Sequence, residues 1–487
     1  MGGSAETVRL AASTPLSSYA DPLALDSGNG IIPSVFDGLT SIESNGTVHP
    51  ALALSWANHS GTKWVFELRP DVVFHDDSPF NADTVVDYLT FLSKPESFAY
   101  PIAAEAKSIE SVRKLGPLTV EITTHNPDPV LPRKLSRIKM ISMQIWRERG
   151  RTAFSKQPVG TGPYSILEWS RGGSTGVVMT AAQNSWRPSE QIDRVEYVIL
   201  SDASARLQSL LSGAVDIANG IDPDAISVVE AAGYTIDRQL GPIVLAIAFH
   251  NCGDTPTPSH DIRVRRALAM SVDKKRIVEQ LLSNTTDVAD QGGTPGVFGY
   301  NPEIQPYPFD PDAARTLLAD AGFGNGLDLV IGLFSGQFPA DTLIFQQMAQ
   351  DWAAIGVNAE LRRFAFPEYM RRANAADWDG VDAISVPWSS YQHGEVSRTM
   401  KRFAGDYAGP YFCAPELLDD IAASDIEMDE KVREKMLQDL MARLHDLVPS
   451  LPLVRYVSIN GLSPRVPELK SRNTGAILFG EMRVVSE

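Results

Sequence analysis

The sequence has very little cysteine, no long hydrophobic run and no cluster of metal-binding side chains. Its 487 residues include two cysteines, Cys252 and Cys413. These either form a disulfide in an oxidising compartment or stay as buried thiols, and the sequence leaves both alternatives open. No stretch comes near the roughly 18 consecutive apolar residues that a membrane-spanning helix needs. Because the cysteines and the eight histidines show no zinc-site spacing, we expect no bound metal and no cofactor.

Signatures of catalysis are also missing. The chain has no phosphate-binding P-loop, no H-E-x-x-H zinc motif and no G-x-G-x-x-G turn after a strand. His75 stands beside Asp76 and Asp77, which is one arrangement for acid–base or metal chemistry. We interpret these three as solvated turn residues, and we expect the protein not to be an enzyme.

Basic side chains are outnumbered by acidic ones. The sequence has 43 Lys and Arg against 60 Asp and Glu, which gives a formal net charge of -17. Such a charge repels nucleic acids and anionic membrane surfaces at long range, so neither is an expected partner. The arginine pairs at 362–363 and 371–372 are interpreted as solvated faces. The alternative is that an arginine between residues 362 and 402 contacts an anionic group of a ligand.

Predicted strands and helices alternate along the chain, which is typical of an α/β protein. Residues 119–123 and 195–200 have strand patterns, and residues 310–321 have the N-cap and the first-turn Pro of a helix that Gly322 ends. Two nearly continuous apolar strands, at 242–249 and 451–459, are predicted to cross between two lobes and to form a hinge. A ligand cleft is expected between the lobes.

These crossings give the predicted domain boundaries. Lobe I comprises residues 7–245 and 458–487, with a subdomain around 40–159, and lobe II comprises residues 246–457. Residues 1–6 are interpreted as an added or disordered start, and any signal peptide is expected to have been removed. A length of 487 residues fits two or three domains with ample core.

Five segments carry a resemblance to a known family. They are residues 51–89, with an alternating strand at 64–69 and a helix cap at Asn81, followed by 157–164 (QPVGTGPY), 211–217 (LSGAVDI), 264–273 (VRRALAMSVD) and 307–323 (YPFDPDAARTLLADAGF). In content and order they resemble extracytoplasmic solute-binding proteins of the peptide, nickel and opine class, family 5. The resemblance implies a two-lobed periplasmic-binding-protein fold with a larger, divided first lobe. It also implies a periplasmic location, a small-molecule ligand and delivery to the permease subunits of an ABC importer. A monomer is the simplest expectation.

Ligand specificity is expected on residues 386–412, which are rich in aromatic, hydroxyl and basic groups. In the dipeptide binders that the chain resembles, an acidic residue shortly after a tryptophan pairs with the amino terminus of the ligand. Here the first acidic residue after Trp388 is Glu395. A buried ammonium group without a carboxylate partner is costly, so this departure weakens the case for a peptide ligand.

Aromatic faces, hydroxyls and arginine together suit a sugar ring that carries a phosphate or a carboxylate. The resemblance to opine binders of this class implies an opine-like ligand or a phosphorylated sugar of the agrocinopine type. An oligopeptide or dipeptide is the alternative, and a metal chelate or a hydrolytic role is less favoured. The predicted ligand-binding residues are Tyr19, Asn29 and Tyr100 of lobe I and Trp388, Ser389, Ser390, Tyr391, His393 and Arg398 of lobe II. We expect Trp388→Ala to weaken binding and to leave the fold intact. The competing interpretation places Trp388 and Tyr391 in the core beneath a loop and leaves Tyr100 as an exposed loop residue.

Overall fold

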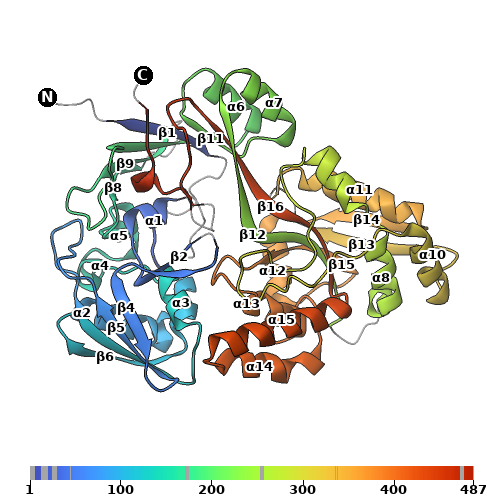
Figure 1. Ribbon diagram of the computed structural model, residues 1–487, viewed down its shortest axis with the longest axis horizontal. Helices are drawn as coiled ribbons and strands as arrows, with labels where there is room; N and C mark the ends of the chain where they lie inside the picture. Colours follow the sequence, from blue (N-terminus) through green and yellow to red (C-terminus); the bar gives the residue numbers. More distant parts are fainter. Residues whose placement is uncertain are drawn as a thin grey trace. The chain divides into compact units, whose positions relative to one another are not determined.

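Two long strands divide the chain into two units. Unit 1 comprises Met1–Gln239 and Ser458–Glu487, and unit 2 comprises Leu240–Val457. β12 (Thr235–Phe249) and β16 (Ser450–Leu462) each begin in one unit and end in the other, so the chain crosses twice (Figure 1). The computed structural model describes residues 6–12, 20–24, 30–43, 45–169, 175–252, 257–334, 336, 338–407, 409–471 and 476–485.

The main sheet of unit 1 is built around its first strand. The strand order is β11-β1-β10-β9-β8, with β11 at Ile217–Asn219, β1 at Thr7–Ala12, β10 at Arg194–Ile199, β9 at Thr175–Ala181 and β8 at Tyr164–Trp169. β1 runs parallel to β10 and β11, whereas β9 is antiparallel to both β10 and β8. Val8 and Leu10 of β1 and Val195 and Tyr197 of β10 are buried, as expected where every second side chain faces a core.

A second, antiparallel sheet gives unit 1 its divided character. Its order is β4-β5-β7-β6, with β4 at Ala53–Asn58, β5 at Lys63–Leu68, β7 at Thr119–Thr124 and β6 at Ile109–Gly116. In β5 the side chains of Trp64, Phe66 and Leu68 are buried in alternation, which confirms the predicted strand. α2 (Ala82–Leu92) packs on β6 and β7, and the predicted cap is confirmed because the Asn81 side chain accepts two backbone hydrogen bonds from the first turn. The other helices and strands of unit 1 are α1 (Ile31–Val35), β2 (Thr40–Ile42), β3 (Val48–Pro50), α3 (Leu131–Arg137), α4 (Met143–Arg149), α5 (Arg151–Lys156), α6 (Ala203–Leu211) and α7 (Ile226–Ala231).

The glycine-rich turn before β8 packs directly on the backbone of α1. A Cβ on Gly160 would lie 1.9 Å from the carbonyl oxygen of Val35, and one on Gly162 would lie 2.4 Å from that of Ser34. His75 holds the same turn, because its Nε2–H donates to the carbonyl of Gly162 (2.9 Å) and its Nδ1 accepts from the N–H of Gly160 (3.4 Å). Burial lowers the pKa of His75. The interpretation of His75 as a solvated turn residue is therefore wrong. Its neutral imidazole is hydrogen-bonded to the glycine-rich turn and has a structural role.

Unit 2 contains three parallel strands beside β12. The order is β14-β13-β15-β12, with β14 at Val357–Arg363, β13 at Leu327–Leu333 and β15 at Ala383–Ser389. β13 is parallel to β14 and to β15, and β12 is antiparallel to β15. Alternate residues of β12 serve two cores: Leu245, Ile247 and Phe249 belong to one, whereas Val244, Ala246 and Ala248 belong to the other.

Helices cover both faces of this sheet (Figure 1). One face carries α8 (Ile262–Met270), α10 (Pro311–Asp320) and α11 (Asp341–Ala354), and the other carries α12 (Phe366–Ala375), α13 (Ser397–Ala404), α14 (Leu418–Ile426) and α15 (Glu430–Asp446). The short helix α9 (Lys274–Arg276) follows α8. The predicted start of α10 is confirmed, because Asp310 caps it and Pro311 is its first residue. No helix in the described ranges is both long and apolar enough to cross a membrane.

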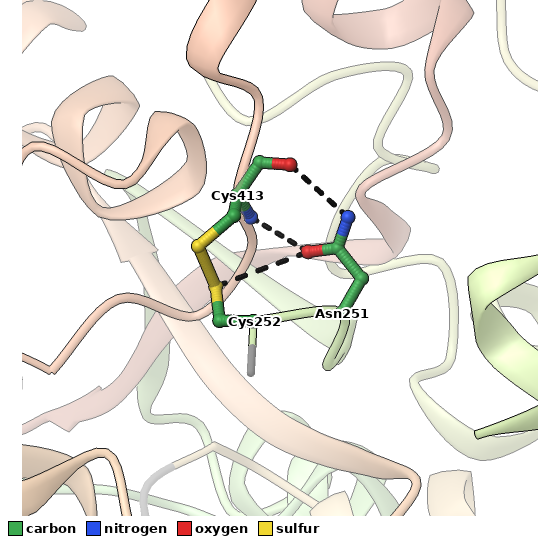
Figure 2. The surroundings of a disulfide bond; sticks show 3 residues. All are labelled: Asn251, Cys252 and Cys413. Carbon is green, nitrogen blue, oxygen red and sulfur yellow. Dashed lines mark hydrogen bonds between the residues drawn. A yellow bond between two sulfur atoms is a disulfide. The ribbon is translucent and has the colours of Figure 1, made fainter. Parts of the chain in front are cut away.

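The two cysteines of unit 2 form a disulfide. The sulfur atoms of Cys252 and Cys413 lie 2.11 Å apart, so of the two alternatives the bonded one is found. Asn251 adds a clamp, because its side-chain oxygen accepts from the N–H of Cys413 (2.6 Å) and its amide donates to the carbonyl of Cys413 (3.0 Å) (Figure 2). The segment that leads into α14 is therefore fixed to the end of β12.

Candidate ligand-binding site

The carboxyl ends of β13, β14 and β15 lie at one edge of the unit 2 sheet, because these strands are parallel. In open α/β sheets, ligands bind outside the carboxyl ends of the strands. The chain leaves these three strands at Phe334, Phe364 and Ser390. This edge is the candidate ligand-binding surface of unit 2.

Two aromatic residues that sequence reasoning missed lie at this edge. The ring centroid of Phe334 is 5.0 Å from that of Phe366 and 5.3 Å from that of Tyr369. Tyr369 is buried and its hydroxyl donates to the carbonyl of Ser385 (2.6 Å), so it fixes the cluster from below. The side chain of Phe366 remains 55% exposed and offers an aromatic face. Phe366 could have been found from its position in the sequence, because it stands a few residues after the end of a strand and at the start of a helix.

The predicted serines lie where β15 ends. The N–H of Ser390 donates to the carbonyl of Pro242 (2.9 Å), and the carbonyl of Ser389 accepts from the hydroxyl of Thr399 (2.6 Å). These bonds fix the backbone and join α13 to the edge. The Ser390 hydroxyl is buried and has no hydrogen-bond partner within the described part of the chain. A buried hydroxyl without a partner is costly, so Ser390 is suited to bind an incoming polar group.

Trp388 is a core residue. Its side chain is 2% exposed, and its ring stacks on Phe403 at 4.2 Å between centroids with an interplanar angle of 16°. Gly292 lies so close to the indole that a Cβ there would be 1.9 Å from Cδ2. One face of the indole lies on Phe403 and nearly the whole side chain is buried, so packing accounts for Trp388 without a ligand. The expectation that Trp388→Ala leaves the fold intact is corrected, because the substitution would empty part of the core.

The first acidic residue after Trp388 is already paired. The two carboxylate oxygens of Glu395 accept hydrogen bonds from the two terminal nitrogens of Arg433, both at 2.9 Å. The side chains are 0% and 3% exposed, respectively, and the hydroxyl of Ser397 also donates to Glu395. Glu395 therefore joins the segment after β15 to α15, and its charge is neutralised inside unit 2.

The remaining predicted residues of unit 2 lie between the end of β15 and the first turn of α13. Tyr391 is half-buried and His393 is buried, at 8% exposure. Arg398 lies in the first turn of α13, and its positive charge acts on the hydroxyl of Tyr407. Burial acts to raise the pKa of Tyr407, but Arg398 and Arg402 outweigh it and hold that pKa below its ordinary value. This positive cluster was predicted only in part, through Arg398.

The residues predicted from the first lobe are placed differently. Tyr100 is half-buried in unit 1, with its ring centroid 5.9 Å from that of Phe91 and 6.3 Å from that of Trp146. The guanidinium of Arg151 lies 5.0 Å from the Tyr100 centroid and pairs with Asp21 (2.8 Å). Tyr100 is therefore part of an aromatic cluster rather than a bare loop side chain. Tyr19 and Asn29 lie outside the described residues.

Comparison with known proteins gives the context of this surface. The family model of bacterial extracellular solute-binding proteins, family 5 (middle), matches residues 47–408. Di/tripeptide-binding protein 1 of Pseudomonas aeruginosa is 28% identical over 385 residues, which cover 73% of this chain and 70% of that protein. Heme-binding protein A of Haemophilus influenzae is 25% identical over 487 residues, which cover 90% of this chain and 84% of that protein.

Solved structures match along the whole chain. HbpA2 from Haemophilus parasuis has a TM-score of 0.82 and 22% identity, and the match covers 99% of this chain and 100% of that one. The periplasmic binding protein AgaA from A. tumefacien R10, in complex with agropinic acid, has a TM-score of 0.80 and 20% identity, with 99% of both chains covered. These matches confirm the predicted α/β, two-lobed periplasmic-binding-protein fold. Family 5 consists of transport binding proteins rather than enzymes, and its members deliver ligands to the permeases of ABC importers. The chain belongs to the bacterial extracellular solute-binding proteins of family 5.

Proposed function

We propose that this protein captures a small polar ligand of the sugar or opine class, phosphorylated sugars such as agrocinopines included, in the periplasm. It then hands the ligand to the permease subunits of an ABC importer. The observation that carries the choice of ligand is the pairing of Glu395 with Arg433.

A free peptide brings an ammonium group that needs a carboxylate when it is buried. Between residues 386 and 412 the only carboxylates are Glu395 and Asp406. Glu395 is buried with a guanidinium as its partner, and Asp406 is exposed in the turn after α13. Hydroxyl and aromatic groups at the same edge instead suit rings that carry hydroxyls.

The proposed contacts combine those predicted from the sequence with those found at the edge. An aromatic face at Phe366 packs against the apolar side of the ligand, and the hydroxyls of Ser389 and Ser390 bind its polar groups. Tyr391, His393 and Arg398 complete the surface of unit 2. Tyr19, Asn29 and Tyr100 remain the proposed contacts of unit 1, whereas Trp388 supports the surface from the core.

Delivery would follow closure of the two units around the ligand, by bending of β12 and β16. Both strands pass between the units, so a change in a few backbone angles in each is enough to close them. The protein would act as a monomer. Small-angle X-ray scattering tests this mechanism, because closure reduces the radius of gyration at saturating ligand, and an unchanged radius contradicts it.

A peptide ligand is the second candidate. It is favoured by the 28% identity to di/tripeptide-binding protein 1 and the 29% identity to the dipeptide-binding protein of Pseudomonas aeruginosa. Isothermal titration calorimetry against agropinic acid, an agrocinopine, the neutral sugars and a set of dipeptides separates the two. We expect the tightest binding among the opines and sugar derivatives. Tighter binding of dipeptides would refute the sugar or opine assignment.

A further inference from the structure

Two arginines and two tyrosines form a cluster on α13 and in the turn that follows it. The guanidinium of Arg402 lies 4.4 Å from the ring centroid of Tyr407 and 4.9 Å from that of Tyr411. Its Nη1 donates to the hydroxyl of Tyr411 at 2.8 Å. Arg398 and Arg402 both act on the hydroxyl of Tyr407 and hold its pKa below the ordinary value. Tyr407 is 37% exposed, so part of the cluster is accessible to solvent.

The cluster is held rigidly by its surroundings. The N–H groups of Tyr411 and Phe412 donate to the carbonyl of Arg402, at 2.8 and 3.3 Å. The ring of Tyr411 packs edge-on against Phe403, 5.5 Å away, and Phe403 stacks on the core. Immediately afterwards the disulfide and Asn251 fix Cys413 (Figure 2). Groups that are already ordered lose little conformational entropy when a ligand binds them.

Gly409 adds a further constraint on the same turn. Its φ is +72°, in the left-handed region that favours glycine, and a Cβ there would lie 1.9 Å from the carbonyl oxygen of Ala373 in α12. The turn therefore sits directly on the end of α12. This contact and the disulfide hold the turn from two sides.

Among the residues that the structure describes, no acidic side chain pairs with Arg402. Lys401, the preceding residue, pairs with Asp425, whereas Arg402 has no carboxylate within ion-pair distance in the described part of the chain. The chain as a whole carries a net charge of -17 and repels anions at long range. Capture of an anionic ligand therefore requires a local group of donors, and a pair of guanidinium groups is suited to the oxygens of carboxylates and phosphates.

We propose that Arg398, Arg402 and Tyr407 bind an oxyanion, a carboxylate or a phosphate, on the captured ligand. The hydrogen bond from Thr399 to Ser389 places α13 directly beside the edge where the ligand is proposed to bind. The guanidinium groups and the hydroxyl of Tyr407 donate hydrogen bonds to the oxyanion. This inference rests on the proposed function. It adds that the ligand carries a carboxylate or a phosphate, which a neutral sugar lacks.

The test uses probes that differ in their anionic group. Calorimetric titrations with inorganic phosphate, glucose 6-phosphate, glucose, octopine, a free dipeptide and its amide are made on the wild type, Arg402→Gln and Tyr407→Phe. Arg315→Gln is the matched control, because it removes the same charge from α10 on the opposite face of the sheet. Circular dichroism and thermal unfolding show that each variant is folded, and Tyr407→Phe keeps the ring that packs on Arg402.

We expect Arg402→Gln to weaken binding of the anionic probes about 10- to 100-fold, and Tyr407→Phe to weaken it less, while Arg315→Gln changes it by less than about threefold. Equal affinity of the wild type and Arg402→Gln for every anionic probe, or no binding of any of them, overturns the proposal. A dipeptide that loses affinity on amidation and in Arg402→Gln would keep the oxyanion site and refute the sugar or opine ligand. Tight binding of glucose that none of the variants alters would keep the ligand class and refute the oxyanion site.

Discussion

Glu395→Gln perturbs an ion pair that joins the segment after β15 to α15. The carboxylate accepts two hydrogen bonds of 2.9 Å from Arg433, and the two side chains are 0% and 3% exposed. Substitution leaves the guanidinium buried without its counter-charge, although the carbonyl of Ser424 still accepts its Nε–H (2.9 Å). Removal of one partner from a buried ion pair costs about 3–5 kcal/mol.

Differential scanning calorimetry measures this cost. In a unit of about 150–250 residues each kcal/mol lowers the Tm by about 2–4 °C, so the transition of unit 2 should fall by roughly 6–20 °C. Asp439→Asn is the matched control, since it removes the same charge from the exposed pair with Lys435 on the same helix and should cost less than about 0.5 kcal/mol. If Glu395→Gln lowers the Tm no more than Asp439→Asn does, the reasoning is refuted and Glu395 becomes available to a peptide ammonium.

Substitutions at Trp388, His75 and the disulfide test other parts of the structure. Trp388→Ala should destabilise unit 2 by about 3–5 kcal/mol in urea unfolding, with Trp388→Phe milder, and an unchanged midpoint would contradict its place in the core. Burial lowers the folded-state pKa of His75, so its contribution is complete above the unfolded pKa of about 6.5 and is lost as the pH falls below it. His75→Gln, which keeps a donor for Gly162, should therefore reduce the loss of Tm between about pH 6.5 and 5, and parallel curves would speak against this. The disulfide links residues 161 positions apart, so Cys252→Ser with Cys413→Ser should cost about 2–5 kcal/mol. Reductant should lower the Tm of the wild type but not that of the double variant. If reductant leaves the Tm of the wild type unchanged, the disulfide does not stabilise the protein.

The local signals in the sequence were sufficient for many elements of the fold. Asp310 and Pro311 mark the start of α10 because a cap and a first-turn proline act within a few residues. The alternation in β5 needs only neighbouring side chains, and so does the long apolar run of β12. Family motifs such as the glycine turn were found by resemblance, but their reason lies in contacts with α1 and His75 that are distant in sequence.

The candidate site was less accessible to sequence reasoning. Trp388 stands near polar residues in the sequence, but the pleat of β15 directs its ring to the core and onto Phe403. Phe334 and Phe366 meet only because β13 and β14 are parallel neighbours. No local pattern reveals that Glu395 is paired with a residue 38 positions away.

Native mass spectrometry of the purified protein, before and after mild denaturation, tests the central claim most directly. A ligand that has travelled with the protein is seen as added mass on the folded form and as a free small molecule after unfolding. We predict the mass of a sugar or opine derivative that carries a carboxylate or a phosphate. A ladder of peptide masses would contradict the account, because it would show that an ammonium group is accepted without Glu395.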